Sequence, residues 1–216
     1  MAGDARGIAA AVIRAILFDL GNTIVPFDFQ RGYARMERLC PWPAAEIPKR
    51  LARTDLVQRF ETGAVEPEEF VRRLCAELDL RMTYAEFCEL WSSIFLPDTL
   101  IPESLLGSLA QRYRLLLVSN TNAIHFEMLY ASYPLLRHFH DRVLSHEVGA
   151  LKPSPRIYRE AVARAGCAPG ECFFVDDLAV CVEGARSEGM EVFGAGVIAG
   201  DSLFAFFTST WKAVMR

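Results

Sequence analysis

Residues 16–23 constrain the fold of this 216-residue chain more than any other segment. Residues 12–18, apolar apart from Arg14, end at a single carboxylate, Asp19, and the pair Gly21-Asn22 follows it as a turn signal. A run of β-branched and apolar residues of this length is typical of a strand that is buried on both faces. Open parallel sheets bind their ligands at the carboxyl ends of such strands. The sequence therefore predicts a functional carboxylate at Asp19.

The second half of the chain alternates predicted strands with predicted helices. Strands are expected at 114–118, 142–145, 172–175 and 191–194. Helices are expected at 105–112, 124–130 and 155–165, and a further helix should follow the strand at 172–175 and end at about residue 188. This alternation predicts an α/β fold built on a doubly wound parallel sheet. The core is expected to comprise residues 1–26 and 97–216.

Residues 27–96 show no strand pattern, and we expect them to form an inserted, all-helical cap. One helical stripe combines Phe70, Val71, Leu74, Cys75 and Leu78. Thr83 and Glu86 are spaced as a capping box, which predicts the start of another helix. A further helix is expected to contain Ile47, Leu51, Leu56 and Phe60 and to end at Gly63.

Composition excludes several classes of protein. The net charge is −4, with 23 basic and 27 acidic residues scattered, so no basic face for nucleic acid is expected. Six cysteines without a CxxC pair argue against a zinc site and predict free thiols in a reducing cytosol. The apolar segment before Asp19 lacks the features of a signal peptide. The sequence contains no run of 18 uncharged apolar residues, so no membrane-spanning helix is expected. We therefore expect a cytoplasmic monomer or homodimer that binds neither membrane nor nucleic acid.

Two further features are given conventional interpretations. His138 and His140 resemble a metal pair, but no third ligand accompanies them, so ordinary surface or half-buried histidines are expected. The aromatic tail over residues 203–211 is predicted to form a final helix on the core, with a dimer contact as the alternative and a membrane-surface helix as a weaker third.

Polar residues follow three of the predicted strands. Asp19 ends the first, Ser119-Asn120 ends the second, and Asp176-Asp177 ends the fourth, while Lys152 lies in a loop between the last two groups. Because all these strand ends face one cleft, three carboxylates would repel one another there. A divalent cation that prefers oxygen ligands, such as Mg²⁺, resolves that conflict. The sequence therefore predicts a magnesium site.

Magnesium, a lysine and a hydroxyl together favour phosphate chemistry. A carboxylate and a phosphate dianion repel each other, and Mg²⁺ with Lys152 would offset that repulsion. The Ser119 hydroxyl and nearby backbone N–H groups can donate hydrogen bonds to phosphoryl oxygens. Asp19 could then act as a nucleophile, giving an aspartyl-phosphate that water hydrolyses.

Four ordered motifs carry a family resemblance. Residues 18–23 (FDLGNT), 118–120 (VSN), 151–153 (LKP) and 174–177 (FVDD), the last followed by 182–185 (VEGA), resemble the motifs of the haloacid dehalogenase-like (HAD) hydrolases. The helical segment after the first motif resembles the helical cap of that superfamily. The resemblance implies a Rossmann-like core, an inserted cap and a Mg²⁺-dependent hydrolase.

The cap carries a narrower resemblance. Residues 60–63 (FETG) and 67–70 (PEEF), together with the Gly21-Asn22 turn, resemble the bacterial sugar-phosphatase branch. That branch includes α-D-glucose-1-phosphate phosphatases and relatives of the epoxide-hydrolase phosphatase domain. The resemblance implies a small phosphorylated metabolite as the substrate, expected to be a sugar phosphate.

The same resemblance implies roles for individual residues. Asp19 corresponds to the nucleophile and a Mg²⁺ ligand, and the Gly21 backbone carbonyl to a second ligand. Asp177 corresponds to a direct ligand, with Asp176 beside it or acting through water. Lys152 corresponds to the residue that bridges phosphate and nucleophile. The substrate-binding positions are Ser119, Asn120 and Asn22.

Two departures from the family pattern have consequences. Most phosphatases of the superfamily carry an acid/base Asp two residues after the nucleophile, and that position is Gly21 here. An enzyme without this proton donor should favour good leaving groups, so sugar 1-phosphates are expected to react faster than sugar 6-phosphates. Water or a cap residue such as Glu61 could supply the proton instead. Cys181 stands four residues after Asp177, where the family commonly has Asn or Asp. A polar side chain that would support the metal ligands is therefore missing at this position.

Two other functions remain open at this point. A haloacid dehalogenase would need no metal, and the pair Asp176-Asp177 argues against it because unneutralised acids would repel an anionic haloacid. A catalytically weak binding or regulatory protein that retained the fold is the second alternative.

Overall fold

A computed structural model describes residues 12–193 and contains one five-stranded sheet. All the strand pairs are parallel, and the strand order is β3-β2-β1-β4-β5. The strands are β1 (Ala15–Phe18), β2 (Arg114–Ser119), β3 (Asp141–Leu144), β4 (Cys172–Val175) and β5 (Glu191–Phe193). Strand β1 is central, with Phe18 beside Leu117 of β2 and Val175 of β4. The register therefore brings the residues after β1, β2 and β4 to the same edge.

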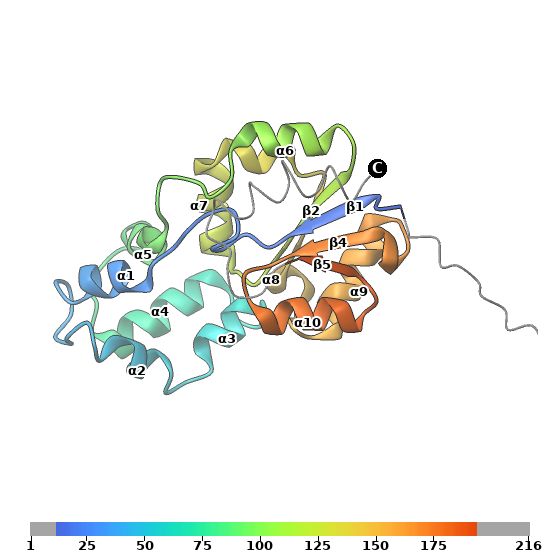
Figure 1. Ribbon diagram of the computed structural model, residues 1–216. Helices are drawn as coiled ribbons and strands as arrows, with labels where there is room; N and C mark the ends of the chain where they lie inside the picture. The colour runs from blue at the N-terminus through green and yellow to red at the C-terminus, as the bar shows by residue number, and fades with distance from the viewer. Residues whose placement is uncertain (1–11, 194–216) are drawn as a thin grey trace, which may run out of the picture.

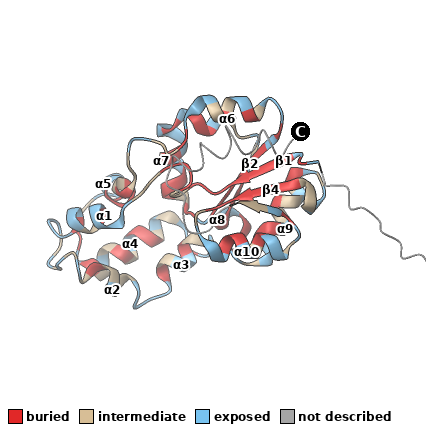
Figure 2. Cartoon of the chain, in the orientation of Figure 1, coloured by how far each residue is buried: buried red, intermediate tan, exposed pale blue. Residues whose placement is uncertain are grey.

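Helices cover both faces of the sheet (Figure 1). They are α6 (Glu103–Ala110), α7 (Ala123–Ser132), α8 (Ser145–Val148), α9 (Pro155–Ala165) and α10 (Ala179–Ser187), with 3₁₀ turns η2 (Pro134–His138) and η3 (Pro169–Glu171). Alternate residues of β1 enter opposite clusters: Ile16 and Phe18 pack with α6 and α7, whereas Leu17 packs with α9 and α10. The sheet is consequently buried on both sides (Figure 2), as the apolar runs predicted.

A separate helical unit lies between β1 and α6 in the chain (Figure 1). It comprises α1 (Phe29–Met36), α2 (Ile47–Leu51), α3 (Leu56–Glu61), α4 (Pro67–Leu78), α5 (Tyr84–Trp91) and η1 (Ser92–Ile94). Its residues, with Ile124 of α7, form a third hydrophobic cluster around stacked Phe60 and Phe70, whose ring centroids are 4.0 Å apart. The capping box of Thr83 and Glu86 is present at the start of α5, which confirms that prediction.

The structure corrects two local predictions. Strand β1 begins at Ala15 rather than at Val12, whose side chain is 73% exposed. The single helix expected through Ile47 and Leu56 is instead two short helices, α2 and α3. These two residues are nine positions apart, which is half a turn out of phase on one continuous helix, yet both are buried. The break between α2 and α3 allows both side chains to face the same cluster.

Two predictions about the chain as a whole have different outcomes. No helix within residues 12–193 is long and apolar enough to cross a bilayer. The predicted final helix over residues 203–211 lies outside the described residues.

Candidate active site

Two strand-end carboxylates converge on a lysine ammonium. Lys152 Nζ lies 2.6 Å from Asp19 Oδ1, at the end of β1, and 2.6 Å from Asp176 Oδ2, at the end of β4. All three residues are buried. Asp176 is fixed further, because its Oδ1 accepts a hydrogen bond of 2.8 Å from the Leu178 backbone N–H. The structure thus joins residues 133 positions apart in the sequence in one charged cluster.

The electrostatics of this cluster are unbalanced. Burial, with the charge of Asp176, raises the pKa of Asp19 to about 6, although Lys152 acts in the opposite direction. Burial, followed by the charge of Asp176, also raises the pKa of half-buried Asp177. Burial disfavours the Lys152 ammonium, but the two carboxylates outweigh it and raise the pKa of Lys152. One ammonium therefore faces three carboxylates that it cannot neutralise.

The donor set suits a hard divalent cation. Asp19, Asp176 and Asp177 each place a carboxylate oxygen within 4.8 Å of the others. Residues 12–193 contain no other such group of three His, Cys, Asp or Glu side chains. His138 contacts Glu103 at 3.1 Å, and His140 Nδ1 accepts a hydrogen bond from the Leu115 N–H. Oxygen-only ligands with excess negative charge fit Mg²⁺ rather than zinc.

Asn120 positions the lysine. Its Oδ1 accepts a hydrogen bond of 2.7 Å from the Lys152 N–H, and its Nδ2 donates one of 3.0 Å to the Lys152 carbonyl. This pairing clamps the end of β2 to the loop that carries the ammonium. The neighbouring Ser119 is buried and lines a cavity beside the cluster. The Asn120 side chain, predicted to bind substrate, therefore holds the backbone of the lysine loop.

The turn after the expected nucleophile has an unusual backbone. Asn22 adopts a left-handed conformation with φ of 51°, which Asn tolerates better than most residues. Its Oδ1 accepts a hydrogen bond of 3.1 Å from the Phe27 N–H. Asn22, predicted to bind substrate, thus uses its carbonyl to hold the turn and does not line the cavity.

A cavity of about 440 Å³ lies between the sheet edge and the helical unit. Gly21, Ser119 and Asn120 supply its polar floor. Its walls carry mainly apolar and aromatic side chains of the helical unit and of the residues that flank it, among them Phe27, Phe29, Tyr33, Met36, Val57, Trp91 and Phe95. A mostly apolar cavity with a few polar groups at one end is the usual form of a small-molecule site.

His125 also lines this cavity, and the sequence analysis did not identify it. Its Nε2 lies 3.1 Å from the Trp91 carbonyl and its Nδ1 lies 3.1 Å from Asn122 Nδ2. Burial lowers the pKa of His125 to about 4, so the ring is neutral at pH 7. Its position at the start of α7, directly after the polar end of β2, was the available signal. The imidazole therefore supports the wall of the cavity.

Cys181 has a packing role at the position where the family commonly carries Asn or Asp. Its side chain is buried in the cluster under α9, and its backbone carbonyl accepts a hydrogen bond of 2.7 Å from the Tyr158 hydroxyl. Burial raises the pKa of Cys181 to about 11, so the thiol is uncharged at neutral pH. It therefore adds no negative charge to the carboxylate cluster.

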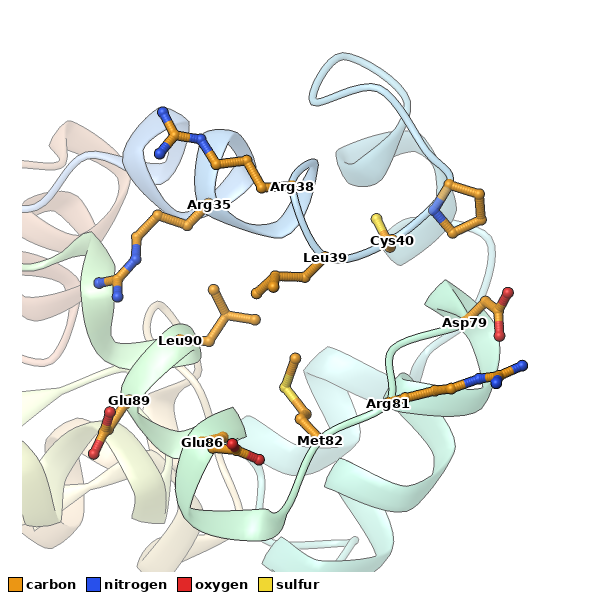
Figure 3. A pocket seen from close by; sticks show the side chains of 11 residues that line it. Arg35, Arg38, Leu39, Cys40, Asp79, Arg81, Met82, Glu86, Glu89 and Leu90 are labelled. Carbon is orange, nitrogen blue, oxygen red and sulfur yellow. The ribbon is translucent and has the colours of Figure 1, made fainter.

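A larger cavity, of about 740 Å³, lies within the helical unit. Leu39, Leu90 and Met82 project into it, whereas the Arg38 and Arg81 guanidinium groups point away (Figure 3). None of the strand-end residues lines it. Its size alone does not make it the site of chemistry, and we assign the chemistry to the cavity beside Asp19.

Comparison with known proteins agrees with this geometry. A family model described as haloacid dehalogenase-like hydrolase matches residues 13–189. The chain belongs to the haloacid dehalogenase-like hydrolases. The predicted family, the hydrolase class and the α/β fold are thereby confirmed.

Relatives of this HAD-like hydrolase include named phosphatases. D-ribitol-5-phosphate phosphatase of Bacteroides thetaiotaomicron is 27% identical over 190 residues, covering 84% of this chain and 91% of the relative. Glyceraldehyde 3-phosphate phosphatase of Methanopyrus kandleri is 27% identical over 193 residues, covering 83% of this chain and 82% of the relative. A HAD family enzyme of B. thetaiotaomicron, crystallised with magnesium and inorganic phosphate, superposes with a TM-score of 0.77 at 23% identity, covering 94% of this chain and all of that one. This last likeness shows the shared fold.

Proposed function

We propose that this chain is a Mg²⁺-dependent phosphatase that hydrolyses a small phosphorylated metabolite, a sugar phosphate, through an aspartyl-phosphate on Asp19. The observation that carries the proposal is the position of the buried Lys152 ammonium, 2.6 Å from the carboxylates of both Asp19 and Asp176. A dianionic phosphate approaches a carboxylate only where fixed positive charge offsets their repulsion. The two phosphatase relatives, named for small phosphate monoesters, support a substrate of this class.

Asp19 supplies the nucleophile in this mechanism. One carboxylate oxygen forms a bond to phosphorus while the bond from phosphorus to the leaving oxygen breaks, and that oxygen takes up a proton. Water then attacks phosphorus, the bond to Asp19 breaks, and inorganic phosphate leaves with the carboxylate restored. Lys152 and the Ser119 hydroxyl donate to the phosphoryl oxygens in both steps.

The metal would lie among the carboxylates. Asp19, Asp177 and the Gly21 carbonyl would hold Mg²⁺, with Asp176 beside them or acting through water. Bound there, the ion supplies positive charge against the phosphoryl oxygens. The Lys152–Asp176 contact keeps the ammonium and the acidic pair in register, because Asp176 also accepts from the Leu178 N–H.

Residues 27–96 act, in this proposal, as a cap over a core formed by residues 1–26 and 97–216. The support is the cavity whose floor comes from strand ends and whose walls come from the helical unit. Closure of such a unit excludes water and selects the leaving group. The six free thiols support a reducing, cytoplasmic setting.

The direct test is hydrolysis of p-nitrophenyl phosphate with and without Mg²⁺. The wild type should be active with Mg²⁺ and lose activity with a chelator, and Asp19→Asn should lose at least about 10³-fold in kcat/KM. Asp98→Asn, an exposed carboxylate in the segment before α6, is the matched control and should keep wild-type activity. An inactive wild type would favour a binding or regulatory protein, and metal-independent activity on 2-haloacids would indicate a dehalogenase.

A further inference from the structure

Phe27 occupies the space that a side chain at position 21 would need. A Cβ atom built on Gly21 would lie 2.7 Å from Phe27 Cε1, closer than real Cβ contacts. The Phe27 ring also packs edge-on against Phe29 and Phe95, which limits its freedom to move. Gly21 has no side chain to give a proton, so the proton that a leaving oxygen requires comes from another group.

The cavity wall offers three titratable side chains among the residues that line it, namely Tyr33, Glu61 and His125. Both ring nitrogens of His125 have polar partners, and its pKa of about 4 leaves no proton to give at neutral pH. Burial raises the pKa of Tyr33 above its ordinary value of 10, so its phenol is too weak an acid for efficient transfer. Glu61 is the carboxyl group that remains.

The Glu61 carboxylate lies in the cavity wall without a partner among the described residues. It is the last residue of α3 and is partly buried in the cavity wall. Within the described part of the chain, no hydrogen bond or ion pair engages its carboxylate, whereas surface acids such as Glu69 are paired with arginine. Burial also raises the pKa of Glu61, which moves it toward the range of a general acid.

The backbone after Glu61 is fixed against the core. Gly63 has a φ of +68°, and a Cβ on it would lie 2.1 Å from the His146 carbonyl oxygen in α8. Only glycine allows the α3–α4 turn to approach α8 so closely. One residue before Glu61, Phe60 is stacked on Phe70 in the centre of the helical unit. Both sides of Glu61 are therefore anchored, one to the core and one to the cap.

We propose that Glu61 is the general acid that protonates the leaving oxygen, an inference that rests on the phosphatase function proposed above. As the bond from phosphorus to the leaving oxygen breaks, that oxygen takes the proton from the Glu61 carboxyl group, and the alcohol departs neutral. The Glu61 carboxylate is then placed to accept a proton from the water that attacks the aspartyl-phosphate, which restores its acid form. The acid thus comes from the cap, whereas the nucleophile comes from the core.

Leaving-group dependence separates an acid from a merely structural residue. Glu61→Gln keeps the size of the side chain and removes its exchangeable proton. Its kcat/KM should fall by about 10²–10⁴-fold on a sugar 6-phosphate, whose alkoxide leaves poorly, and by less than about threefold on p-nitrophenyl phosphate, whose phenolate needs no proton. The ratio kcat/KM reports the first phosphoryl transfer and is independent of later hydrolysis. Glu66→Gln, an exposed acid nearby, should leave both rates unchanged.

Each outcome decides between the proposals. Equal losses on both substrates, or no loss on either, would overturn the role of Glu61 while leaving an active phosphatase in place. A wild type without activity on any phosphate ester would overturn the phosphatase function and this role together. If Glu61→Gln fails to fold, Glu61→Asp replaces it, since it keeps the acid but shortens its reach. That variant should lose more on the 6-phosphate than on p-nitrophenyl phosphate, and a uniform loss would again overturn the role.

Discussion

The floor and the wall of the cavity are built on opposite principles. The floor comes from residues at strand ends, and beside it Lys152 Nζ lies 2.6 Å from both Asp19 and Asp176 in a buried charged cluster. The wall consists of aromatic and apolar side chains on helices, with the Glu61 carboxyl free of ion pairs among the described residues. Under the proposed mechanism, we expect changes at the strand ends to abolish the chemistry and changes in the wall to alter the choice of substrate.

The largest expected effect is removal of the Lys152 ammonium beside the floor. Lys152→Ala should lower kcat/KM by about 10²–10³-fold, because a preorganised donor to the phosphoryl group is lost. It should also destabilise the metal-free protein by about 3–5 kcal/mol, because two buried carboxylates lose their shared partner. Activity assays and urea unfolding measure the two effects. Added Mg²⁺ should recover part of the stability.

Lys49→Ala is the control for that experiment, since Lys49 forms a surface pair with Glu46. It should change neither rate nor stability measurably. A Lys152→Ala protein as active as the wild type would contradict the assignment of the chemistry to the charged groups at the strand ends.

The next effect concerns selection by the wall. Tyr33→Ala enlarges the cavity without touching the strand ends. The ratio of kcat/KM between a six-carbon and a three-carbon phosphate should shift by about 10-fold toward the larger substrate. The rate on the preferred substrate should stay within a few-fold of the wild type. Tyr84→Ala, at an exposed position of α5, is the control, and an unchanged ratio in Tyr33→Ala would contradict a selective wall.

The relative rates on sugar 1-phosphates and sugar 6-phosphates test whether Glu61 in the wall supplies the proton. Gly21 alone predicts faster cleavage of 1-phosphates, because an anomeric oxygen leaves more easily. If Glu61 supplies the proton, the wild type should show a modest preference that grows about 10-fold or more in Glu61→Gln. Parallel kcat/KM measurements on glucose 1-phosphate and glucose 6-phosphate test this, and equal rates in both proteins would count against it.

The smallest expected effect is a pH dependence of stability from His125. Burial depresses its pKa to about 4, so between pH 6.5 and 4 the unfolded chain binds more protons than the folded chain. The free energy of unfolding should therefore fall as pH falls, by about 1–3 kcal/mol from this residue. Urea unfolding of the wild type and His125→Gln at pH 7 and pH 4.5 measures the contribution of His125 to the free energy of unfolding. A difference between the two proteins that stays constant with pH would contradict it.

The floor could be predicted from the sequence for a physical reason. Parallel strands that are buried on both faces have nearly continuous apolar sequences. The acids that follow two of them, Asp19 and Asp176, are therefore easy to identify in the sequence. Because parallel strands place their carboxyl ends at one edge of a sheet, strand ends far apart in the chain could be grouped before the structure was known. The register of β1 with β4 confirms that these two ends lie side by side. The roles of these residues in catalysis remain predictions.

The wall could not be predicted in the same way. Tyr33 and His125 line the cavity because helices of the cap and core pack in one particular arrangement, which depends on tertiary contacts rather than on local pattern. The break between α2 and α3 illustrates the point, since Ile47 and Leu56 would lie on opposite faces of one continuous helix, yet both pack into the same cluster. Asn120 was placed correctly at a strand end, yet its clamp on the Lys152 backbone depends on a loop that no periodicity describes.

A crystal structure with Mg²⁺ and orthovanadate tests the central claim most directly, because vanadate imitates the phosphoryl group in transfer. We expect vanadium in line with an Asp19 oxygen, Mg²⁺ about 2.1 Å from oxygens of Asp19 and Asp177, and Lys152 on an equatorial oxygen. Glu61 should be the carboxyl group nearest the apical oxygen opposite Asp19. Vanadate bound away from Asp19, or an apical oxygen that only solvent contacts, would contradict a site shared between core and cap.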